Sequence, residues 1–214
     1  KSTIPPGTTA RWNNMFDNID IVFNPEFLTE ANSVNDFKNQ TRIIIGGPKN
    51  AASRVRRLFV KAFPKVKIIK TDSTYAEMVK YVTNCFLAMK VSFANEMYEI
   101  SNALGIDYDK VIEYAMHDDR LGYSHWSVPG PDGDFGYGGH CFPKDVKALI
   151  KVAHDLNVSP KMLIATHTKN NDVRKNRDWE QMEGRAVINH GTPKQKVSTN
   201  PLDYLPPHDY QLDN

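Results

Sequence analysis

The chain has 214 residues, of which 40% are hydrophobic and 24% are charged, a composition typical of a soluble globular protein with one large or two small domains. We interpret its formal net charge of +2 as basic and acidic residues interspersed, and therefore expect no nucleic acid and no membrane as a partner. Cys85 and Cys141 are the only cysteines, which argues against a disulfide scaffold and for a reducing, cytoplasmic compartment.

Residues 1 to about 71 alternate between short apolar runs and a helical stretch. The runs are rich in Val and Ile and lie at 19–23, 42–45 and 66–69, with a helix predicted at 51–63. Continuous apolar runs separated by a helix favour parallel strands of an α/β sheet. Three strands and one helix make only half a sheet. We therefore interpret residues 1–72, which open at Lys1 without a methionine, as the C-terminal part of a larger α/β domain in a fragment.

From Thr74 the pattern changes to long helices. Thr74 followed by Glu77 has the spacing of a capping box, and Gly105 is a natural stop. The run between them predicts one helix of about 30 residues, roughly 45 Å long. Its apolar residues spread around much of the circumference, so it needs cover on more than one side. We expect a second copy of the chain to supply that cover, giving a two-fold homodimer through residues 74–103.

Three further helices are predicted: one after Asp107, one from near Pro143 to about Leu156, and one from Pro160. The stretch from about Arg174 is polar and rich in proline, so we expect it to lie extended on the surface or to fray. The predicted fold class is therefore α/β followed by all-α, with a helical domain at 73–177 and an extended tail at 178–214.

The stretch Gly136-Tyr-Gly-Gly-His-Cys-Phe-Pro-Lys-Asp145 carries the clearest chemical signal. Its glycines let the backbone approach a bulky ligand, and its proline fits the first turn of a helix. Cys141 is therefore predicted at a helix N-terminus with Lys144 nearby, and both features stabilise a thiolate. The alternative is a buried structural cysteine; we favour a nucleophile.

Other patterns are weaker. Ile45-Gly-Gly-Pro-Lys49 resembles a phosphate loop but lacks the Walker spacing, so we predict no phosphate site there. The histidines show no metal-ligand spacing, and the adjacent His140 and Cys141 cannot readily chelate one ion together, so no metal is expected. Cys85 falls inside the long predicted helix and is interpreted as a core residue.

The stretch around Cys141 resembles the active-site loop of the UDP-glucose/GDP-mannose dehydrogenase family, the nucleotide-sugar 6-dehydrogenases. Other segments are similar to that family in the same order: Lys1-Ser-Thr-Ile-Pro-Pro-Gly7, Asn24-Pro-Glu-Phe-Leu-Thr-Glu30, Lys80-Tyr-Val-Thr-Asn84 with Asn95-Glu96, and Asp119-Arg-Leu-Gly122. The matches cover residues 1 to about 177. The resemblance implies that residues 1–72 are the C-terminal part of a Rossmann-like NAD-binding domain, and that residues 73–177 are a central helical domain that forms dimers.

Members of this family oxidise C6 of a hexose twice, from alcohol to acid, and reduce two NAD. The resemblance therefore implies NAD as cofactor and Cys141 as the nucleophile that forms a thiohemiacetal and then a thioester. It implies that Thr3 and Glu30 position water, and that Lys80, Asn84 and Asp145 handle the C6 oxygen. Lys80 and Asn84 are four residues apart on one predicted helix and so share a face. The alternatives are a solvated Lys/Asn pair and, for Asp145, a first-turn acid that complements the helix dipole.

The resemblance also implies binding residues. Besides Lys80 and Asn84, those expected to contact the nucleotide sugar are Glu26, Phe27, Leu28, Thr29, Glu30, Arg120, His125, Trp126, Ser127 and Gly138. Those expected to contact NAD are Thr3, Glu30 and Lys144. Arg120 is expected to meet the diphosphate of a neighbouring subunit's substrate. An extra turn, Gly130-Pro-Asp-Gly-Asp134, departs from the family pattern next to residues 125–129.

The chain contains no G-x-G-x-x-G, so we expect the dinucleotide fingerprint upstream of Lys1 and expect the fragment alone to bind NAD poorly and to be inactive. The function we favour for the parent protein is oxidation of UDP-glucose to the uronic acid; GDP-mannose and a UDP-N-acetylhexosamine are alternative substrates. A non-catalytic helical dimerisation module is an alternative of another class. A thiol hydrolase is a poorer one, because no histidine is convincingly placed in the sequence to activate Cys141.

Overall fold

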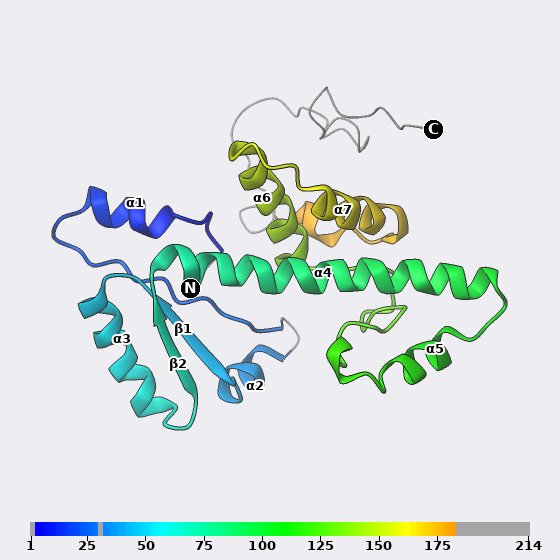
Figure 1. Ribbon diagram of the computed structural model, residues 1–214, viewed down its shortest axis with the longest axis horizontal. Coiled ribbons are helices and arrows are strands. Elements are labelled where there is room, and N and C mark those ends of the chain that lie inside the picture. The colour runs from blue at the N-terminus through cyan, green and yellow to red at the C-terminus, as the bar shows by residue number, and fades with distance from the viewer. Residues whose placement is uncertain (1–2, 30–31, 183–214) are drawn as a thin grey trace. The chain divides into compact units, whose positions relative to one another are not determined.

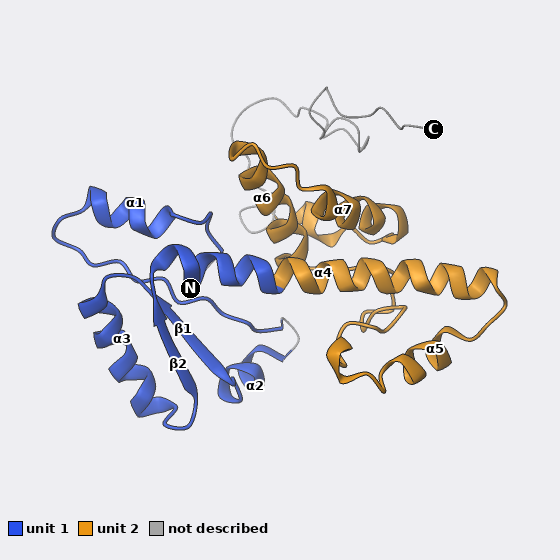
Figure 2. Cartoon of the chain, in the orientation of Figure 1, with its two compact units in different colours: residues 1–83 blue, residues 84–214 orange. Residues whose placement is uncertain are grey.

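A computed structural model describes residues 3–29 and 32–182 of the chain. The chain divides into two compact units, residues 1–83 and residues 84–214 (Figure 2). The observed fold class is the predicted one: a short parallel β-α-β segment comes first, and a mostly helical part with one long helix follows (Figure 1).

The first unit is built on two parallel strands, β1 (Arg42–Gly46) and β2 (Lys67–Thr71), joined by the helix α3 (Lys49–Ala62). These elements confirm the strands predicted at 42–45 and 66–69 and the helix predicted at 51–63. Alternate side chains of β1 point to opposite faces of the sheet. Ile43 and Ile45 pack with α3 residues such as Ala52, whereas Ile44 packs with Ala76 on the other face. The two apolar faces explain why β1 reads as a continuous apolar run.

The strand predicted at residues 19–23 was wrong. Only Phe23 pairs with β1, through one antiparallel bridge to Gly46. The backbone of Ile21 instead makes its hydrogen bonds with the side chain of Asn13, at 2.8 and 2.9 Å. The Asn24 side-chain amide likewise donates to a carbonyl oxygen of β1 at 2.7 Å. Side-chain amides therefore bind the backbone groups that a strand ladder would have bound.

The helix α1 (Thr8–Met15) is capped by a residue far away in the sequence. The Glu77 side chain is fully buried, and its two carboxylate oxygens accept hydrogen bonds from the backbone N–H groups of Gly7, at 2.6 Å, and Thr9, at 2.9 Å. The capping box predicted from Thr74 and Glu77 was therefore wrong. The long helix begins one residue before Thr74, and the Glu77 carboxylate instead binds N–H groups at the start of α1 that have no partner within that helix.

The helix α4 (Ser73–Ala103) has 31 residues and confirms the predicted long helix. It runs from the first unit into the second (Figure 2). Gly105 takes a φ of +69° just beyond its end, which is the left-handed conformation expected of a glycine stop. Large apolar side chains that remain exposed on α4 recur every three, four or seven residues: Tyr75, Met78, Val82, Phe86, Phe93 and Ile100. This spacing aligns them in one stripe along one side of the helix. We call these six residues the α4 stripe.

The second unit confirms the three further predicted helices, now α5 (Tyr108–Ala115), α6 (Cys141–Asp155) and α7 (Lys161–Val173). Asp107 caps α5 by accepting from the backbone N–H groups of Asp109 and Lys110. The short 3-10 helices η2 (Asp119–Leu121) and η3 (Asp178–Gln181) complete the described elements. A core cluster of Ala94, Tyr108 and Val128 packs with Met97, Tyr98, Ile112, Trp126 and Phe135.

The end of the second unit differs from the extended, polar segment expected from Arg174 onward. Arg174 is 4% exposed and Trp179, in η3, is 2% exposed. Both side chains are therefore part of the unit's interior, and Arg174 forms ion pairs with Asp132 and Asp134 of the loop that precedes α6. The prediction for residues 183–214 lies outside the described residues, as does the proline-rich part on which it rested.

The basic residues are not interspersed as we interpreted them from the net charge. Residues 49–70 contain no Asp or Glu and eight exposed basic residues: Lys49, Arg54, Arg56, Arg57, Lys61, Lys65, Lys67 and Lys70. Arg54, Arg57 and Lys61 are three and four residues apart on α3, so they lie on one face. Among the described residues, Arg54 alone of the eight has an acidic partner, Asp20 at 3.9 Å. We call these eight residues the basic surface.

Candidate active site

Cys141 is the first residue of α6, one turn before Asp145. The helix start predicted near Pro143 is confirmed, and the observed helix begins two residues earlier, at Cys141. The thiol is half-buried, and its Sγ lies 3.5 Å from Nε2 of His140. A histidine is thus in contact with the cysteine, contrary to the sequence interpretation that none was placed to activate it. We missed it because adjacent side chains usually point apart.

Asp145 is fully buried and binds two partners. One carboxylate oxygen forms an ion pair with Nζ of Lys144, and the other accepts a hydrogen bond from the Asn84 side-chain amide at 2.6 Å. Asn84 is itself 6% exposed. The buried charge of Asp145 is therefore paired and hydrogen-bonded. The structure brings together three predicted site residues here, and Lys144 contacts Asp145, where we had expected its charge to act on Cys141.

Lys80 is also buried, at 5% exposed. Its Nζ donates a hydrogen bond to the backbone carbonyl of Glu26 at 2.6 Å and lies 5.8 Å from the centre of the Phe27 ring. It precedes Asn84 by one turn of α4. The alternative of an ordinary solvated Lys/Asn pair was therefore wrong, because both side chains are buried and each has a specific partner.

The segment 26–29 is held by short contacts in the first unit. Arg42 lies over the Phe27 ring, 4.3 Å from its centre. The backbone N–H and hydroxyl of Thr29 both donate to Asp36 of α2 (Ser33–Lys38), at 2.7 and 2.6 Å, and these hydrogen bonds lower the pKa of the Asp36 carboxyl. Leu28 is half-buried, as is Thr3 in the segment before α1. The predicted residue Glu30 lies outside the described residues.

The glycine-rich loop before Cys141 is fixed by side chains from three elements. The backbone N–H groups of Gly136 and Tyr137 donate to the side-chain oxygens of Asn95, at 3.1 Å, and Asn170, at 2.7 Å. Both asparagines are buried. The N–H of Gly139 donates to both carboxylate oxygens of Asp178 at 3.1 Å. Asn95 belonged to the family resemblance, but no sequence signal pointed to Asn170 or Asp178 as supports of the loop.

The extra turn at 130–134 is also tied into the unit. The buried Arg174 guanidinium lies 2.6 Å from a carboxylate oxygen of Asp132 and 3.5 Å from one of Asp134. The hydrogen bond from Arg174 lowers the pKa of Asp132, and a backbone hydrogen bond from Asn176 lowers that of Asp134. A side chain at Gly138 would collide with the Arg174 guanidinium, 2.2 Å from the position of its Cβ. Gly138 therefore leaves room for Arg174, in addition to its predicted approach to substrate.

The predicted sugar-nucleotide segment 125–127 lies over α4. His125 is half-buried, and burial lowers its pKa, with the nearby charge of Lys90 acting in the same direction. Nζ of Lys90 donates to the carbonyls of residues 121 and 122, at 2.9 and 2.7 Å, and lies 4.7 Å from the centre of the Trp126 ring. Ser127 is exposed. Lys90 was missed from the sequence because nothing distinguishes it from other helical lysines.

Arg120 is placed apart from these contacts, in η2. Its side chain is 88% exposed and forms an ion pair with the neighbouring Asp118. An exposed arginine can bind an external anion, but to do so Arg120 must first break its ion pair with Asp118. The structure does not bring Arg120 to the other predicted substrate residues of its own chain through any contact among the described residues.

Cys85 has the character of a core residue, as predicted. It is 4% exposed, and burial raises the pKa of its thiol to about 12, with the charge of Asp145 adding to the effect. A protonated, buried thiol is unreactive. The two cysteines of the chain therefore differ in environment, and only Cys141 lies at a helix start with access to solvent.

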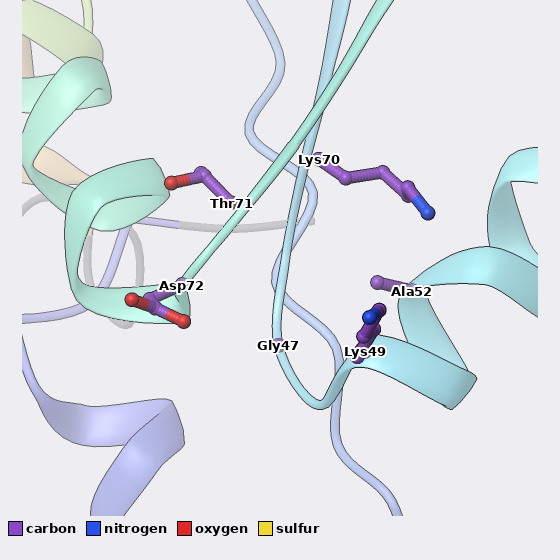
Figure 3. Close-up of a pocket in the computed structure, with 6 residues that line it drawn as sticks. All are labelled: Gly47, Lys49, Ala52, Lys70, Thr71 and Asp72. Carbon is purple, nitrogen blue, oxygen red and sulfur yellow. The ribbon is translucent and has the colours of Figure 1, made fainter.

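The loop from 45 to 49 borders a shallow cavity of about 370 Å³ in the first unit (Figure 3). It is lined by Gly47, Lys49, Ala52, Lys70, Thr71 and Asp72. Nζ of Lys70 donates to the Ser53 hydroxyl at 2.9 Å, so one of its two lysines already has a partner. The cavity lies at the carboxyl ends of β1 and β2, where parallel sheets commonly bind ligands. Our sequence interpretation, that no phosphate binds here, stays a prediction.

No helix among residues 3–29 and 32–182 is long and apolar enough to cross a membrane. Within the same ranges, no three His, Cys, Asp or Glu residues are grouped so that they could hold a metal ion.

Comparison with known proteins identifies the class to which this arrangement belongs. Residues 1–63 match the NAD binding domain, and residues 74–172 the central domain, of one family of dehydrogenases. The chain belongs to the UDP-glucose/GDP-mannose dehydrogenase family. The two matched regions agree with the α/β segment and the helical segment of the structure.

Individual relatives agree with this assignment. The chain is 37% identical over 201 residues to the UDP-glucose 6-dehydrogenase of Rhizobium meliloti, a match that covers 88% of this chain and 43% of the relative. It is 37% identical over 177 residues to the UDP-glucose 6-dehydrogenase of Campylobacter jejuni, covering 82% and 43%.

Solved structures show the same fold. A UDP-glucose dehydrogenase from Pyrobaculum islandicum aligns with a TM-score of 0.72 at 34% identity, over 80% of this chain and 40% of that one. A UDP-D-ManNAc dehydrogenase from Pyrococcus horikoshii aligns with a TM-score of 0.65 at 26% identity, over 79% and 40%. The chain thus spans about 40% of the length of the relatives it matches.

Proposed function

We propose that this chain is the substrate-oxidising part of an NAD-dependent nucleotide-sugar 6-dehydrogenase that converts UDP-glucose to the uronic acid. The observation that carries the proposal is the environment of Cys141. The thiol lies at the start of α6 with a histidine in contact, and one turn later the buried Asp145 is bound by Asn84. A buried, paired carboxylate next to a cysteine at a helix start is an arrangement that acyl chemistry uses and that a structural module does not need.

The cofactor would be held here only in part. The chain has no G-x-G-x-x-G, so its own contributions are Thr3, Glu30 and Lys144, as the family resemblance assigns them. The Lys144 side chain is 25% exposed, so part of it is accessible to a bound molecule. NAD, when bound, supplies the hydride acceptor for each of the two oxidations. The remaining chemistry belongs to side chains of this chain.

In the proposed reaction Cys141 acts on the aldehyde produced by the first oxidation. Its thiolate forms an S–C6 bond, and the carbonyl electron pair moves to oxygen, giving a thiohemiacetal. The second oxidation converts this adduct to a thioester, and water then breaks the S–C bond to release the acid. Lys80 is proposed to stabilise negative charge that develops on the C6 oxygen. Asp145 with Asn84 is proposed to accept the C6 hydroxyl proton, and Thr3 and Glu30 to position the hydrolytic water.

The proposed substrate contacts are assigned residue by residue from the family. They are Glu26, Phe27, Leu28, Thr29, His125, Trp126, Ser127 and Gly138, with Arg120 meeting a diphosphate. UDP-glucose is favoured because the relatives at 37% identity are UDP-glucose 6-dehydrogenases. A panel of UDP-glucose, GDP-mannose and a UDP-N-acetylhexosamine tests this choice by the rate of NADH formation with each.

The decisive test of the chemistry uses a protein in which this chain is joined to a complete NAD-binding domain. Cys141→Ser should abolish uronic acid formation, because the hydroxyl is a far poorer nucleophile than a thiolate. Cys85→Ser makes the same chemical change at the buried cysteine and should retain activity. Acid formation by Cys141→Ser at the unchanged rate would defeat the proposal.

A second candidate function, a non-catalytic dimerisation module, is favoured by the α4 stripe. Six large apolar side chains in one line are costly to leave in water, each worth about 1.5–3 kcal/mol if fully buried. We propose that two copies pair through this stripe. The pairing is compatible with catalysis, and Arg120 would then complete the neighbour's substrate site. Acid formation by the unsubstituted protein of that experiment separates an enzyme that dimerises from a module that only dimerises.

A further inference from the structure

The side chains of the neighbouring residues Cys141 and His140 are in contact. Nε2 of His140 lies 3.5 Å from Sγ, which is within hydrogen-bond distance for a sulfur atom. His140 occupies the N-cap position of α6, yet its side chain makes no hydrogen bond to the first turn of the helix. The imidazole is thus turned toward the thiol. The side chain of a capping residue would instead have bound N–H groups of the first turn.

The cation that we expected to serve the thiol is engaged elsewhere. Nζ of Lys144 forms its ion pair with the fully buried Asp145. A lysine bound to a carboxylate has little charge left to offer a neighbouring sulfur. The start of α6 contributes a helix dipole, but it has no means of accepting a proton. Nε2 of the His140 imidazole lies at the thiol, and an imidazole nitrogen can accept a proton.

We propose that His140 is a catalytic residue of the reaction above: it removes the proton from Cys141 and holds the thiolate as an imidazolium–thiolate pair. The inference rests on the proposed function for its role in turnover. In the step, the S–H proton moves to Nε2 and the sulfur electron pair forms the S–C6 bond. The carbonyl pair moves to oxygen, which takes the proton back from the imidazolium. The sum is addition of a thiol across C=O, with no proton or electron left over.

The segments of the second unit that contact the loop and the start of α6 carry other titratable and charged groups: Lys144 and Asp145 on α6, Asp178 of η3, Arg174 after α7, Cys85 on α4, and Tyr137 and His125 in the loops. The first four groups have partners of their own. Lys144 forms an ion pair with Asp145, Arg174 forms one with Asp132, and Asp178 accepts a hydrogen bond from the backbone N–H of Gly139.

Burial shifts the pKa of each of the remaining three groups in the direction that favours its neutral form. Burial raises the pKa of the Cys85 thiol to about 12 and that of the Tyr137 hydroxyl still further. Burial lowers the pKa of His125, and the charge of Lys90 acts in the same direction. The reactivity of Cys141 between about pH 5 and about pH 9 is therefore compared between the unsubstituted chain and a His140 variant, so that the effects of these other groups are common to both.

The test measures alkylation of the chain by iodoacetamide across this pH range, with mass spectrometry locating the label on Cys141. It needs neither cofactor nor substrate. His140→Gln should slow the reaction of Cys141 at neutral pH on the order of tenfold and move its midpoint to higher pH, because the amide cannot hold a proton beside the sulfur. His154→Gln is the matched control, since His154 is exposed near the other end of α6. A His140→Gln profile that overlays the unsubstituted one overturns the proposal.

A second measurement requires no substitution, so it holds even where a variant folds poorly. The ring proton of His140 is followed by NMR against pH before and after Cys141 is alkylated. Loss of the thiolate should shift the titration midpoint of the ring to lower pH, because the imidazolium loses its anionic partner. An unchanged midpoint overturns the pair. These outcomes are independent of the proposed function: the expected alkylation result, together with acid still formed by Cys141→Ser, would retain the pair and reject Cys141 as the nucleophile of the oxidation.

Discussion

Replacing Glu77 by Gln should destabilise the first unit without changing the size of the side chain. Glu77 is fully buried on α4, and each of its oxygens accepts one backbone N–H from the start of α1, Gly7 and Thr9. Glutamine keeps one acceptor oxygen, but it turns an NH2 group toward the other N–H. One charge-assisted hydrogen bond is therefore replaced by two donors that face each other.

The magnitude follows from these contacts. Loss of one hydrogen bond to a charged acceptor costs about 1.5–3 kcal/mol. Removing a negative charge from a helix N-terminus costs about 0.3–1 kcal/mol more. We therefore expect the free energy of unfolding of the first unit to fall by about 2–4 kcal/mol. Glu and Gln have nearly equal helix propensity, so α4 itself contributes little to the difference.

The assay compares urea unfolding of Glu77→Gln with that of Glu96→Gln. Glu96 is exposed on the same helix and undergoes the same chemical change. Hydrogen exchange at the amides of Gly7 and Thr9 should also become faster in the first variant and stay unchanged in the second. If the two variants unfold within about 0.5 kcal/mol of each other, the carboxylate does not hold α1 as we describe.

Other predictions concern the second unit, the α4 stripe and the basic surface. Because the pKa values of Asp132 and Asp134 are lowered in the folded chain, their stabilising effect is present above the ordinary carboxyl pKa and lost as pH falls through the lowered values. The urea midpoint of the second unit should therefore fall as the pH is lowered. It should fall less in a variant that carries both Asp132→Asn and Asp134→Asn, because that variant lacks the two carboxylates. Sedimentation should show a dimer of the 24.3 kDa chain that Phe86→Glu splits; a wild-type monomer would reject the pairing. Arg57→Glu with Lys61→Glu should elute from a cation exchanger at clearly lower salt, and equal elution would contradict a concentrated basic surface.

Local patterns predicted most of the secondary structure because they are properties of short segments. The stop at Gly105, the cap at Asp107 and the proline in the first turn of α6 each depend on neighbours within a few residues. The same rule failed for Glu77, whose spacing from Thr74 fits a local cap while its carboxylate binds a helix far away in sequence. Nothing local distinguishes the two outcomes.

The candidate site divides in the same way. Cys141 and Asp145 could be found from sequence because the glycine loop and the helix start surround them in the chain. Asn170 and Asp178, which hold that loop, could not, because an asparagine or aspartate in a polar stretch carries no sign of the N–H it will bind. The direction of Lys144 toward Asp145 was equally hidden, since it depends on the burial of a carboxylate by Asn84 from another helix.

The way the loop before Cys141 is held has a consequence for how the chain reaches its native state. Gly136 and Tyr137 are bonded to partners 41 and 33 residues away, and Gly139 to one 39 residues away. Each of these closures costs chain entropy before the hydrogen bond repays it. We therefore expect the loop to be ordered late in folding, after α4, α6 and α7 have collapsed together. A synthetic peptide spanning the motif would contain the cysteine, the histidine and the glycines, yet it would lack the conformation that places them.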